Sequence, residues 1–590
     1  MLLPRLGLLL LPALLAGAEY SRPATEIIRV DGNIPVPMRD GVKLYADVYR
    51  PSREGKFPVL VVRTPYGKQR EGIHQGLIDF AERGYAVLVQ DVRGRFESDG
   101  QWDPFRNEAK DGYDTVEWAA VQPWSNGKVG MEGGSYLGNV QWQAAAQSPP
   151  HLVATFPSLA STSLYHNTWY HGGAFKLALA FGWGVVRNPR RTMYPQHWHV
   201  ESYAPEEWKY ETILWQLPLA TLDLASFHAP VAHFRDWIRH ESYDNYWKEI
   251  SVEENMGRVT APAHVLGGWF DLLLGGTLNG YTLARKQAGS PAARNGMRMI
   301  VGPWGHGPTR KFGDVDFGPT ANRSSFALNL QWFDHHLMGI DSGIGKEPPV
   351  EIFYMGVNRW AHQADWPVPG TRYTSLYLAG GGSANSSRGD GVLVWDKPAS
   401  PASDRFTYDP ASPVPTHGGN DCCGAPIPAG PVDQRIVEAR ADVLVYTGPI
   451  LQKPLTIAGP VRMKLHAATD GSDTDFFVKL VDVHPNGFAM NLAEGILRAR
   501  YRKTLERAEL LTPNQAYEFE IDMRGTANVF QAGHRIRVDV TSSNFPQYDR
   551  NPNTGEPLGS SAKLRVARQT VFHTPDRPSH IVLPIVEAPW

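Results

Sequence analysis

The residues best suited to chemistry are one serine and the small residues around it. Ser135 stands in the hexapeptide GGSYLG at 133–138, after a run with strand character at 128–131 and before a run with helical spacing at 137–146. A serine on such a strand-to-helix turn projects from the end of a sheet, as in a nucleophile elbow. Because Gly138 follows the serine by three residues instead of the usual two, a glycine-rich turn with an idle serine is the alternative.

A nucleophilic serine needs a base, and the base needs a carboxylate that orients it. In α/β-hydrolases the acid and then the histidine follow the serine along the chain, each in a loop after a later strand. Asp271 ends the run GGWFD after a predicted strand at 263–266, and His306 lies in the run GPWGHG after a predicted strand at 297–301. Both residues therefore stand in the order and in the kind of loop that a triad with Ser135 requires.

Acyl transfer also needs hydrogen-bond donors aimed at the oxyanion that develops on the substrate. The backbone N–H of Tyr136, the residue after the serine, is one candidate. The second donor is expected from the loop after the third strand, which reads RTPYGK at 63–68 and offers the hydroxyl of Tyr66. A tyrosine that only packs against its own loop is the alternative for Tyr66.

Other groups of ligand-type residues fit structural roles better. His335 and His336 are adjacent in a predicted helix, where a solvated pair is expected. His197 and His199 have alternate spacing but no third ligand nearby, and Asp473-Thr474-Asp475 is better explained as the start of a strand than as a calcium site. We therefore predict no metal and no organic cofactor.

The composition is that of a globular protein without a basic surface. The 590 residues carry 58 Lys and Arg against 60 Asp and Glu, so no nucleic acid partner is expected. The only cysteines, Cys422 and Cys423, are adjacent, which excludes a disulfide framework and a cysteine-based zinc site. They can form a vicinal disulfide in an oxidising compartment, and two free buried thiols are the alternative.

The N-terminus has the character of a secretory signal. Arg5 precedes an apolar run from Leu6 to Ala16, and the small residues at 16–18 form a cleavage site after Ala18. The run is too short to span a bilayer core of ~30 Å. We therefore predict a signal peptide at 1–18 and a secreted or periplasmic protein with no membrane span in the mature chain.

Hydrophobic periodicity divides the remaining chain into an α/β part and an all-β part. Short β-branched runs alternate with helical ones, which predicts a parallel sheet covered by helices, and a stretch crowded with Trp and Tyr interrupts this pattern. After a Gly- and Pro-rich segment at 341–349, short alternating runs predict a β-sandwich or jelly roll. The predicted units are an α/β core at 27–161 and 257–340, an inserted helical cap at 162–256 and a C-terminal jelly-roll β-sandwich at 350–590.

Taken together, these segments resemble the cocaine-esterase-like (CocE/NonD) hydrolases, relatives of the X-Pro dipeptidyl peptidases. The resemblance runs through most of the chain, and the ordered set of motifs is specific although no single motif is. The motifs are MRDGVKL at 38–44, RTPYGK at 63–68, DVRGR at 91–95 with SDG at 98–100, GGSYLG at 133–138, GGWFD at 267–271, GPWGH at 302–306, WFD at 332–334 and YMG at 354–356 with Trp360.

The resemblance implies an α/β-hydrolase core, a helical cap inserted in it and a C-terminal jelly roll. It assigns Ser135 as the nucleophile, Asp271 as the acid and His306 as the base. The oxyanion hole would consist of the Tyr66 hydroxyl and the Tyr136 amide.

One departure from related enzymes bears on the substrate. The α-amino-acid ester hydrolases carry acidic residues just past the triad aspartate, where they can bind a substrate ammonium group, whereas here Leu272-Leu273-Leu274 follows Asp271. A cationic amino group would find no partner at that point. The apolar neighbours Trp269 and Phe270 favour a neutral or aromatic acyl group, and both are candidate substrate contacts.

Three functional hypotheses follow. The leading one is a secreted serine hydrolase that cleaves small-molecule carboxylic esters through an acyl-enzyme intermediate, with amides as a further substrate class. The second is an X-Pro dipeptidyl-peptidase-like or acylase amide hydrolase with the same triad. The third, from another class, is a glycan- or polymer-binding protein in which the hydrolase core is inert. None of the three implies an oligomeric state.

Overall fold

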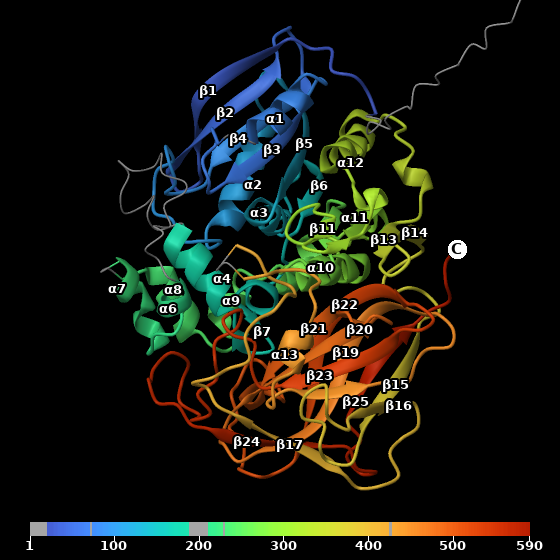
Figure 1. The fold of residues 1–590 in the computed structure, drawn as a ribbon. Helices are drawn as coiled ribbons and strands as arrows, with labels where there is room; N and C mark the ends of the chain where they lie inside the picture. The colour runs from blue at the N-terminus through green and yellow to red at the C-terminus, as the bar shows by residue number, and fades with distance from the viewer. Residues whose placement is uncertain (1–20, 71–72, 188–209, 228–229, 424–426) are drawn as a thin grey trace, which may run out of the picture.

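A computed structural model gives the arrangement of the three predicted parts (Figure 1). It describes residues 21–70, 73–187, 210–227, 230–423 and 427–590. The predicted signal peptide at 1–18 and the histidines at 197 and 199 lie outside the described residues. Within the described ranges, no helix has the length and apolar character needed to cross a membrane.

The α/β core is built on a ten-stranded sheet in the order β1-β2-β4-β3-β5-β6-β9-β10-β13-β14. Neighbours from β4 to β13 are parallel, and the outer pairs are antiparallel. Parallel strands are covered on both faces, which explains continuous hydrophobic runs such as the fully buried β3. The strands are β1 (Ile28–Pro37), β2 (Lys43–Pro51), β3 (Phe57–Thr64), β4 (Ala86–Asp91), β5 (Ser125–Gly134), β6 (Leu152–Ser158), β9 (His264–Gly268), β10 (Arg298–Gly302), β13 (Val350–Tyr354) and β14 (Arg359–Gln363).

The helix that follows the serine packs unusually close to the sheet. A Cβ atom at Gly138 would be 2.7 Å from the Cβ of Ala160 and 2.8 Å from the carbonyl oxygen of Ser158. The glycine that departs from the common elbow spacing is therefore the one that lets this helix approach β6. The helices of the core are α1 (Ile73–Ala81), α2 (Glu108–Ala120), α3 (Tyr136–Ala145), α10 (Leu274–Gln287), α11 (Pro291–Gly296) and α12 (Ser325–Phe333), which continues into the π-helix η7 (Asp334–Met338).

The described part of the cap consists of short helices and one small hairpin, in agreement with its predicted helical character. Its interior is aromatic: Trp169 stacks on Trp237 with ring centroids 3.8 Å apart, and Tyr165 stacks on Tyr170 at 4.6 Å. This packing explains the many aromatic residues without strand alternation. The elements are η1 (Tyr165–Trp169), β7 (Tyr170–His171), β8 (Ala174–Phe175), α4 (Leu177–Leu179), η2 (Ala180–Arg187), α6 (Tyr210–Ile213), η4 (Leu219–Thr221), α7 (Leu222–Phe227), α8 (Ala232–Arg239), α9 (Asn245–Lys248) and η5 (Glu253–Arg258).

The C-terminal unit is a β-sandwich, as predicted. Its strands follow the order β17-β24-β19-β25-β15-β16-β18-β23-β20-β21, with β22 paired to β19. The run Asp473-Thr474-Asp475 leads into β20, and Arg500 and Arg498 pair with its two carboxylates. The elements are β15 (Arg372–Ala379), β16 (Val392–Val394), β17 (Ser403–Tyr408), α13 (Arg435–Glu438), β18 (Leu444–Thr447), β19 (Leu455–Thr469), β20 (Asp475–Val483), β21 (Ala489–Arg498), β22 (Tyr517–Phe530), β23 (Arg535–Thr541), β24 (Ala567–Phe572) and β25 (His580–Ile585).

The boundary between core and sandwich differs from the prediction. We expected the sandwich to begin at 350, but β13 pairs in parallel with β10 and β14 pairs with β13, so both strands extend the core sheet. The first strand of the sandwich, β15, begins at Arg372. A short apolar run does not encode which of two sheets it joins, because its partners are distant in sequence.

The sandwich is attached to the core through the turn after β13. The N–H of Met355 donates to the carbonyl of Ala527 at 3.1 Å, and the N–H of Val529 donates to the carbonyl of Met355 at 2.9 Å. In Figure 1 the cap lies beside the sandwich, and α10 of the core lies against the upper edge of the sandwich.

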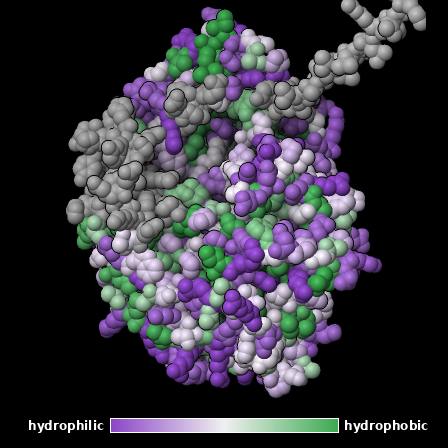
Figure 2. Space-filling model, viewed as in Figure 1, coloured by the Kyte–Doolittle hydropathy of each residue, from purple (hydrophilic) through white to green (hydrophobic). Residues whose placement is uncertain are grey.

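On the face shown in Figure 2, hydrophobic residues occur in small groups among hydrophilic ones, as is ordinary for a protein surface.

Candidate active site

Ser135 occupies a sharp turn between β5 and α3. Its backbone has φ 61° and ψ −124°. A positive φ is uncommon for a residue with a side chain and fits the strained turn of a nucleophile elbow. The turn is held by the Ser135 N–H, which donates to the carbonyl of Ser158 in β6 at 3.0 Å. This geometry favours the predicted nucleophile over an idle serine.

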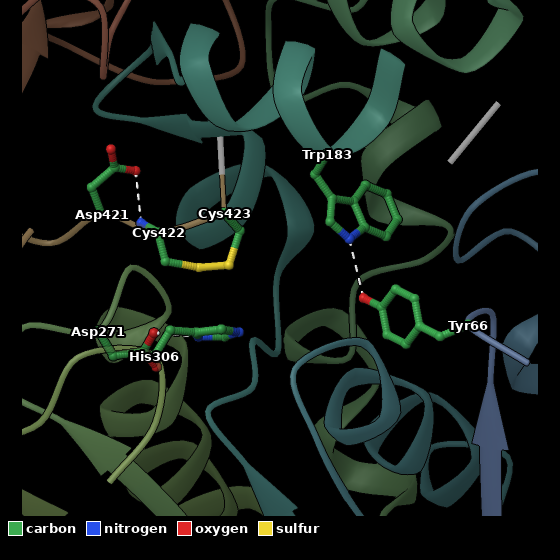
Figure 3. Close-up of a disulfide and its surroundings, with 7 residues drawn as sticks. All are labelled: Tyr66, Trp183, Asp271, His306, Asp421, Cys422 and Cys423. Carbon is green, nitrogen blue, oxygen red and sulfur yellow. Dashed lines mark hydrogen bonds and ion pairs between the residues drawn. A yellow bond between two sulfur atoms is a disulfide. The ribbon is translucent and has the colours of Figure 1, made fainter. Parts of the chain in front are cut away.

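His306 and Asp271 form the acid–base pair that a triad requires. The Nδ1 of His306 lies 2.8 Å from Oδ1 of Asp271, whose side chain is completely buried, while 14% of the imidazole is exposed. When Nδ1–H donates to the carboxylate, Nε2 is left as the proton acceptor, which is the tautomer of a general base. In Figure 3 the outer end of the imidazole points toward the side on which Tyr66 lies.

The loops that carry the pair are joined by backbone hydrogen bonds. The N–H of Trp269 donates to the carbonyl of Gly302, and that of Phe270 donates to the carbonyl of Trp304, both at 2.9 Å. These bonds continue the parallel pairing of β9 with β10 beyond the strand ends. A Cβ atom on Gly268 would lie 2.3 Å from the carbonyl oxygen of Trp304, so glycine is required at this crossing. The acid and the base are therefore positioned as one unit.

The strand order brings the serine to the same edge of the sheet as this pair. Ser135 follows β5, Asp271 follows β9 and His306 follows β10, and in the sheet only β6 separates β5 from β9. The carboxyl ends of parallel strands lie at one edge, where α/β proteins bind ligands.

An asparagine of the sandwich clamps the acid loop, and sequence reasoning missed it. The Nδ2 of Asn420 donates to the carbonyls of Trp269 at 2.9 Å and Asp271 at 3.0 Å. Its own backbone is held by Glu494, which accepts from its N–H at 3.0 Å, and by Gln547, whose amide donates to its carbonyl at 2.8 Å. The only sequence signal was its place two residues before the cysteine pair.

A buried lysine of the cap supports the same loop from another side. The Nζ of Lys176 donates to the carbonyl of Leu272 at 3.0 Å and to that of Asn167 at 3.1 Å. Burial holds the pKa of Lys176 well below its ordinary value, and the charges of Asp421 and Asp271 oppose this shift. The acid loop is thus fixed by the cap and by the sandwich as well as by the core.

The cysteine pair lies beside His306. Cys422 and Cys423 form a disulfide, which was one of the two states left open by the sequence. A ring nitrogen of His306 and both sulfur atoms lie within 4.8 Å of one another, and Figure 3 shows the disulfide alongside the imidazole. Both cysteines are partly buried and pack against an aromatic cluster that includes Tyr136 and Trp183. The sandwich therefore contributes an apolar wall next to the base.

The two predicted oxyanion donors belong to this aromatic cluster. Tyr136 is the first residue of α3, where a backbone N–H has no partner within the helix. Its side chain is fixed because the phenol donates to Glu108 at 2.8 Å and accepts from the N–H of Phe105 at 3.2 Å. The hydroxyl of Tyr66 accepts from Nε1 of Trp183 at 3.1 Å. In Figure 3 Tyr66 lies across from His306, which agrees with a donor that faces the base.

The structure places Trp269 and Phe270 in the core under the site. Each residue is 1% exposed, and Nε1 of Trp269 donates to the carbonyl of Phe353 at 2.8 Å. Phe270 packs against Phe312 and Phe317, with ring centroids 5.9 and 6.4 Å away. This burial does not support the expectation that either ring contacts substrate.

Comparison with known proteins identifies relatives along nearly the whole chain. Residues 40–308 match the X-Pro dipeptidyl-peptidase (S15) family, and residues 342–582 match the X-Pro dipeptidyl-peptidase C-terminal non-catalytic domain. Cocaine esterase from Rhodococcus sp. (strain MB1 Bresler) is 38% identical over 95% of this chain and 99% of its own length.

Two solved structures share the complete architecture. An α-amino-acid ester hydrolase superposes with a TM-score of 0.80 at 27% identity, covering 98% of this chain and 99% of its own. An aminopeptidase from a marine sediment archaeon, Thaumarchaeota archaeon, superposes with a TM-score of 0.81 at 26% identity, covering 95% of this chain and 96% of its own.

Replacement of Asn420 tests whether the sandwich positions the catalytic acid. The variant Asn420→Ala loses two hydrogen bonds to the acid loop, which weakens the free energy that holds the loop in place by ~1–3 kcal/mol. We therefore expect kcat to fall by about tenfold or more with little change in KM. Steady-state ester hydrolysis measures the effect.

The matched control is Asn385→Ala in the sandwich. The Nδ2 of Asn385 also donates to two backbone carbonyls, those of Arg405 and Ala441, but away from the triad. The positioning role is refuted if Asn420→Ala folds like the wild type and keeps its kcat, or if both variants lose activity equally.

Proposed function

This chain belongs to the cocaine-esterase-like (CocE/NonD) family of serine hydrolases, and from that premise we propose that it cleaves carboxylic esters through an acyl-enzyme on Ser135. The observation that carries this proposal is the 2.8 Å hydrogen bond between His306 and the buried Asp271, on loops at the same sheet edge as the serine turn. The inert-core hypothesis is set aside because the chain belongs to a family of enzymes.

The reaction begins when Ser135 attacks the acyl carbon of the ester. Nε2 of His306 takes the hydroxyl proton, and Asp271 stabilises the imidazolium that forms. The alcohol leaves with that proton, and water then hydrolyses the acyl-enzyme by the same relay. The Tyr66 hydroxyl and the Tyr136 amide donate to the oxyanion in both steps.

The walls near the base favour a neutral, apolar acyl group. The core contributes Tyr136, the cap contributes Trp183 and the sandwich contributes the Cys422–Cys423 disulfide. Leu272 and the two residues after it are buried apolar residues, so this segment offers no carboxylate to a substrate ammonium group. These contacts support an ester with an uncharged acyl part.

A second candidate function is X-Pro dipeptidyl-peptidase activity with the same triad. The match of both family domains to X-Pro dipeptidyl-peptidases favours it. The triad and oxyanion hole serve amide cleavage equally well, so the difference between the two functions lies in recognition of the acyl part.

We further propose that the chain is secreted or periplasmic after cleavage behind Ala18. The apolar run at 6–16 supports this proposal, and the Cys422–Cys423 disulfide agrees with an oxidising compartment.

Covalent labelling tests the nucleophile. A fluorophosphonate probe should label the protein once, and Ser135→Ala should lose both the label and ester turnover, whereas Ser375→Ala in β15 should keep both. With p-nitrophenyl esters we expect an initial burst of p-nitrophenol, because acylation precedes hydrolysis of the acyl-enzyme. Labelling that survives in Ser135→Ala would refute the assignment.

A substrate panel separates the two functions. We expect kcat/KM for p-nitrophenyl esters of neutral acids to exceed that for Xaa-Pro-p-nitroanilides by at least about a hundredfold, because a poorly recognised amino terminus forfeits several kcal/mol. A preference for the anilides would instead establish the peptidase.

Removal of one hydroxyl tests the oxyanion hole. Tyr66→Phe should lower kcat by about 10²–10³-fold, because it removes a donor to the developing charge but little ground-state contact. Tyr377→Phe, in β15 of the sandwich, serves as the control and should change kcat less than twofold. A Tyr66→Phe enzyme with wild-type kcat shows that another group donates to the oxyanion.

The mature protein tests the compartment. Expression with the full leader in a Gram-negative host should give a periplasmic or exported protein that begins at Glu19 and has no thiol titratable after unfolding without reductant. An intact Met1 on protein recovered from the cytoplasm contradicts this proposal.

A further inference from the structure

A second cluster of chemistry-bearing side chains lies at one end of the sandwich, in residues that the hydrolase mechanism does not use. Strands β20 and β23 are antiparallel neighbours, and their register ends with Val483 opposite Arg535. One step further along the same register, His484 stands opposite His534. Asp482 precedes His484 by two residues, so both project from the same face of the sheet. The topology therefore brings one carboxylate and two imidazoles together.

The distances fit three ligands of one cation. The Nδ1 of His534 lies 2.8 Å from Oδ1 of Asp482, and one ligand atom from each of the three side chains lies within 4.8 Å of the others. The rings of His484 and His534 have centroids 4.4 Å apart. Two imidazoles bound to one tetrahedral zinc ion at ~2.0–2.1 Å place their centroids about 5 Å apart, so the two rings have to separate by less than about 1 Å to hold the ion.

The surroundings of the cluster favour a cation. The carboxylate of Asp482 is 1% exposed, and its second oxygen accepts from Nδ2 of Asn528 at 3.3 Å, as a residue that orients a metal ligand would do. The Nε2 of His484 is buried and has no hydrogen-bond partner among the residues that the structure describes. Buried polar atoms are normally paired, so this nitrogen remains available to a ligand.

We propose that Asp482, His484 and His534 form a zinc-binding site of the β-sandwich. Two imidazoles and one carboxylate suit Zn²⁺, whereas Ca²⁺ and Mg²⁺ prefer oxygen ligands. His484 and His534 are each partly exposed, and Pro485 and Asn486 beside them are exposed, so an ion can enter from solvent. The sequence prediction of no metal missed the cluster because His534 is 50 residues from His484 along the chain.

The bound ion would join the end of β20 to the start of β23. Zinc bound to the folded chain adds to its stability, because the unfolded chain does not hold the three ligands together. The site lies in the sandwich, away from the residues of the triad. Its occupation should therefore change thermal stability while esterase turnover at ordinary temperature stays the same.

Zinc titration of the full chain tests the proposal. After chelator treatment, calorimetry should show one equivalent of Zn²⁺ bound to these ligands, with a Tm increase of about 2–4 °C at saturation. Co²⁺ should give a visible absorption band that Zn²⁺ displaces. His484→Ala and His534→Ala should each weaken this binding by at least about tenfold.

The control is His466→Ala in β19, a partly buried histidine outside the cluster, which should bind zinc as the wild type does. His484→Gln keeps the size of the side chain and serves if the alanine variant fails to fold. The proposal is overturned if folded His484 variants keep the zinc affinity, the Tm shift and the cobalt absorption band of the wild type. The proposal is also overturned if the chelated wild type binds no zinc below about millimolar concentration. The cluster would then contain only an ordinary hydrogen bond between Asp482 and His534.

Discussion

The hydrogen bond between His306 and the buried carboxylate of Asp271 is the interaction on which the rest of the site depends. A buried carboxylate without a partner is costly, and an imidazole without the carboxylate has no fixed tautomer. Both residues stand on loops, so their 2.8 Å distance is set by the pairing of β9 with β10 and by two backbone hydrogen bonds beyond the strand ends. The parallel sheet thereby aligns an acid with a base.

The surroundings of this pair come from all three units. The core supplies the proposed triad, the cap supplies Trp183 and Lys176, and the sandwich supplies Asn420 and the disulfide. The side-chain amide of Asn420 donates to two carbonyl groups of the acid loop, and these bonds tie the position of Asp271 to the packing of a separate domain. The proposed preference for a neutral acyl group therefore depends on how the three units meet, because each unit contributes residues near His306.

Strained backbone and close contacts between backbone segments both occur around the serine turn and the acid loop. Ser135 keeps a positive φ, and the glycines at 138 and 268 stand where a Cβ atom would collide with a neighbouring strand or loop. The surrounding structure over-determines these conformations, which is how folded proteins maintain strained turns at functional sites. The departure from the common glycine spacing after the serine is explained by the contact of Gly138 with β6.

The sequence by itself determined the family and most of the elements. The serine turn, the two later loops and the helices α2 and α3 were predictable because each depends on residues that are neighbours in the chain, with a strong period of its own. The tertiary structure decided the assignment of β13 and β14 to the core sheet, the burial of Trp269 and Phe270, the clamp by Asn420 and the place of the disulfide beside His306. These features depend on contacts between surfaces that are far apart in sequence. A linear pattern gives the residues of each surface, but it does not say which other surface will pack against it.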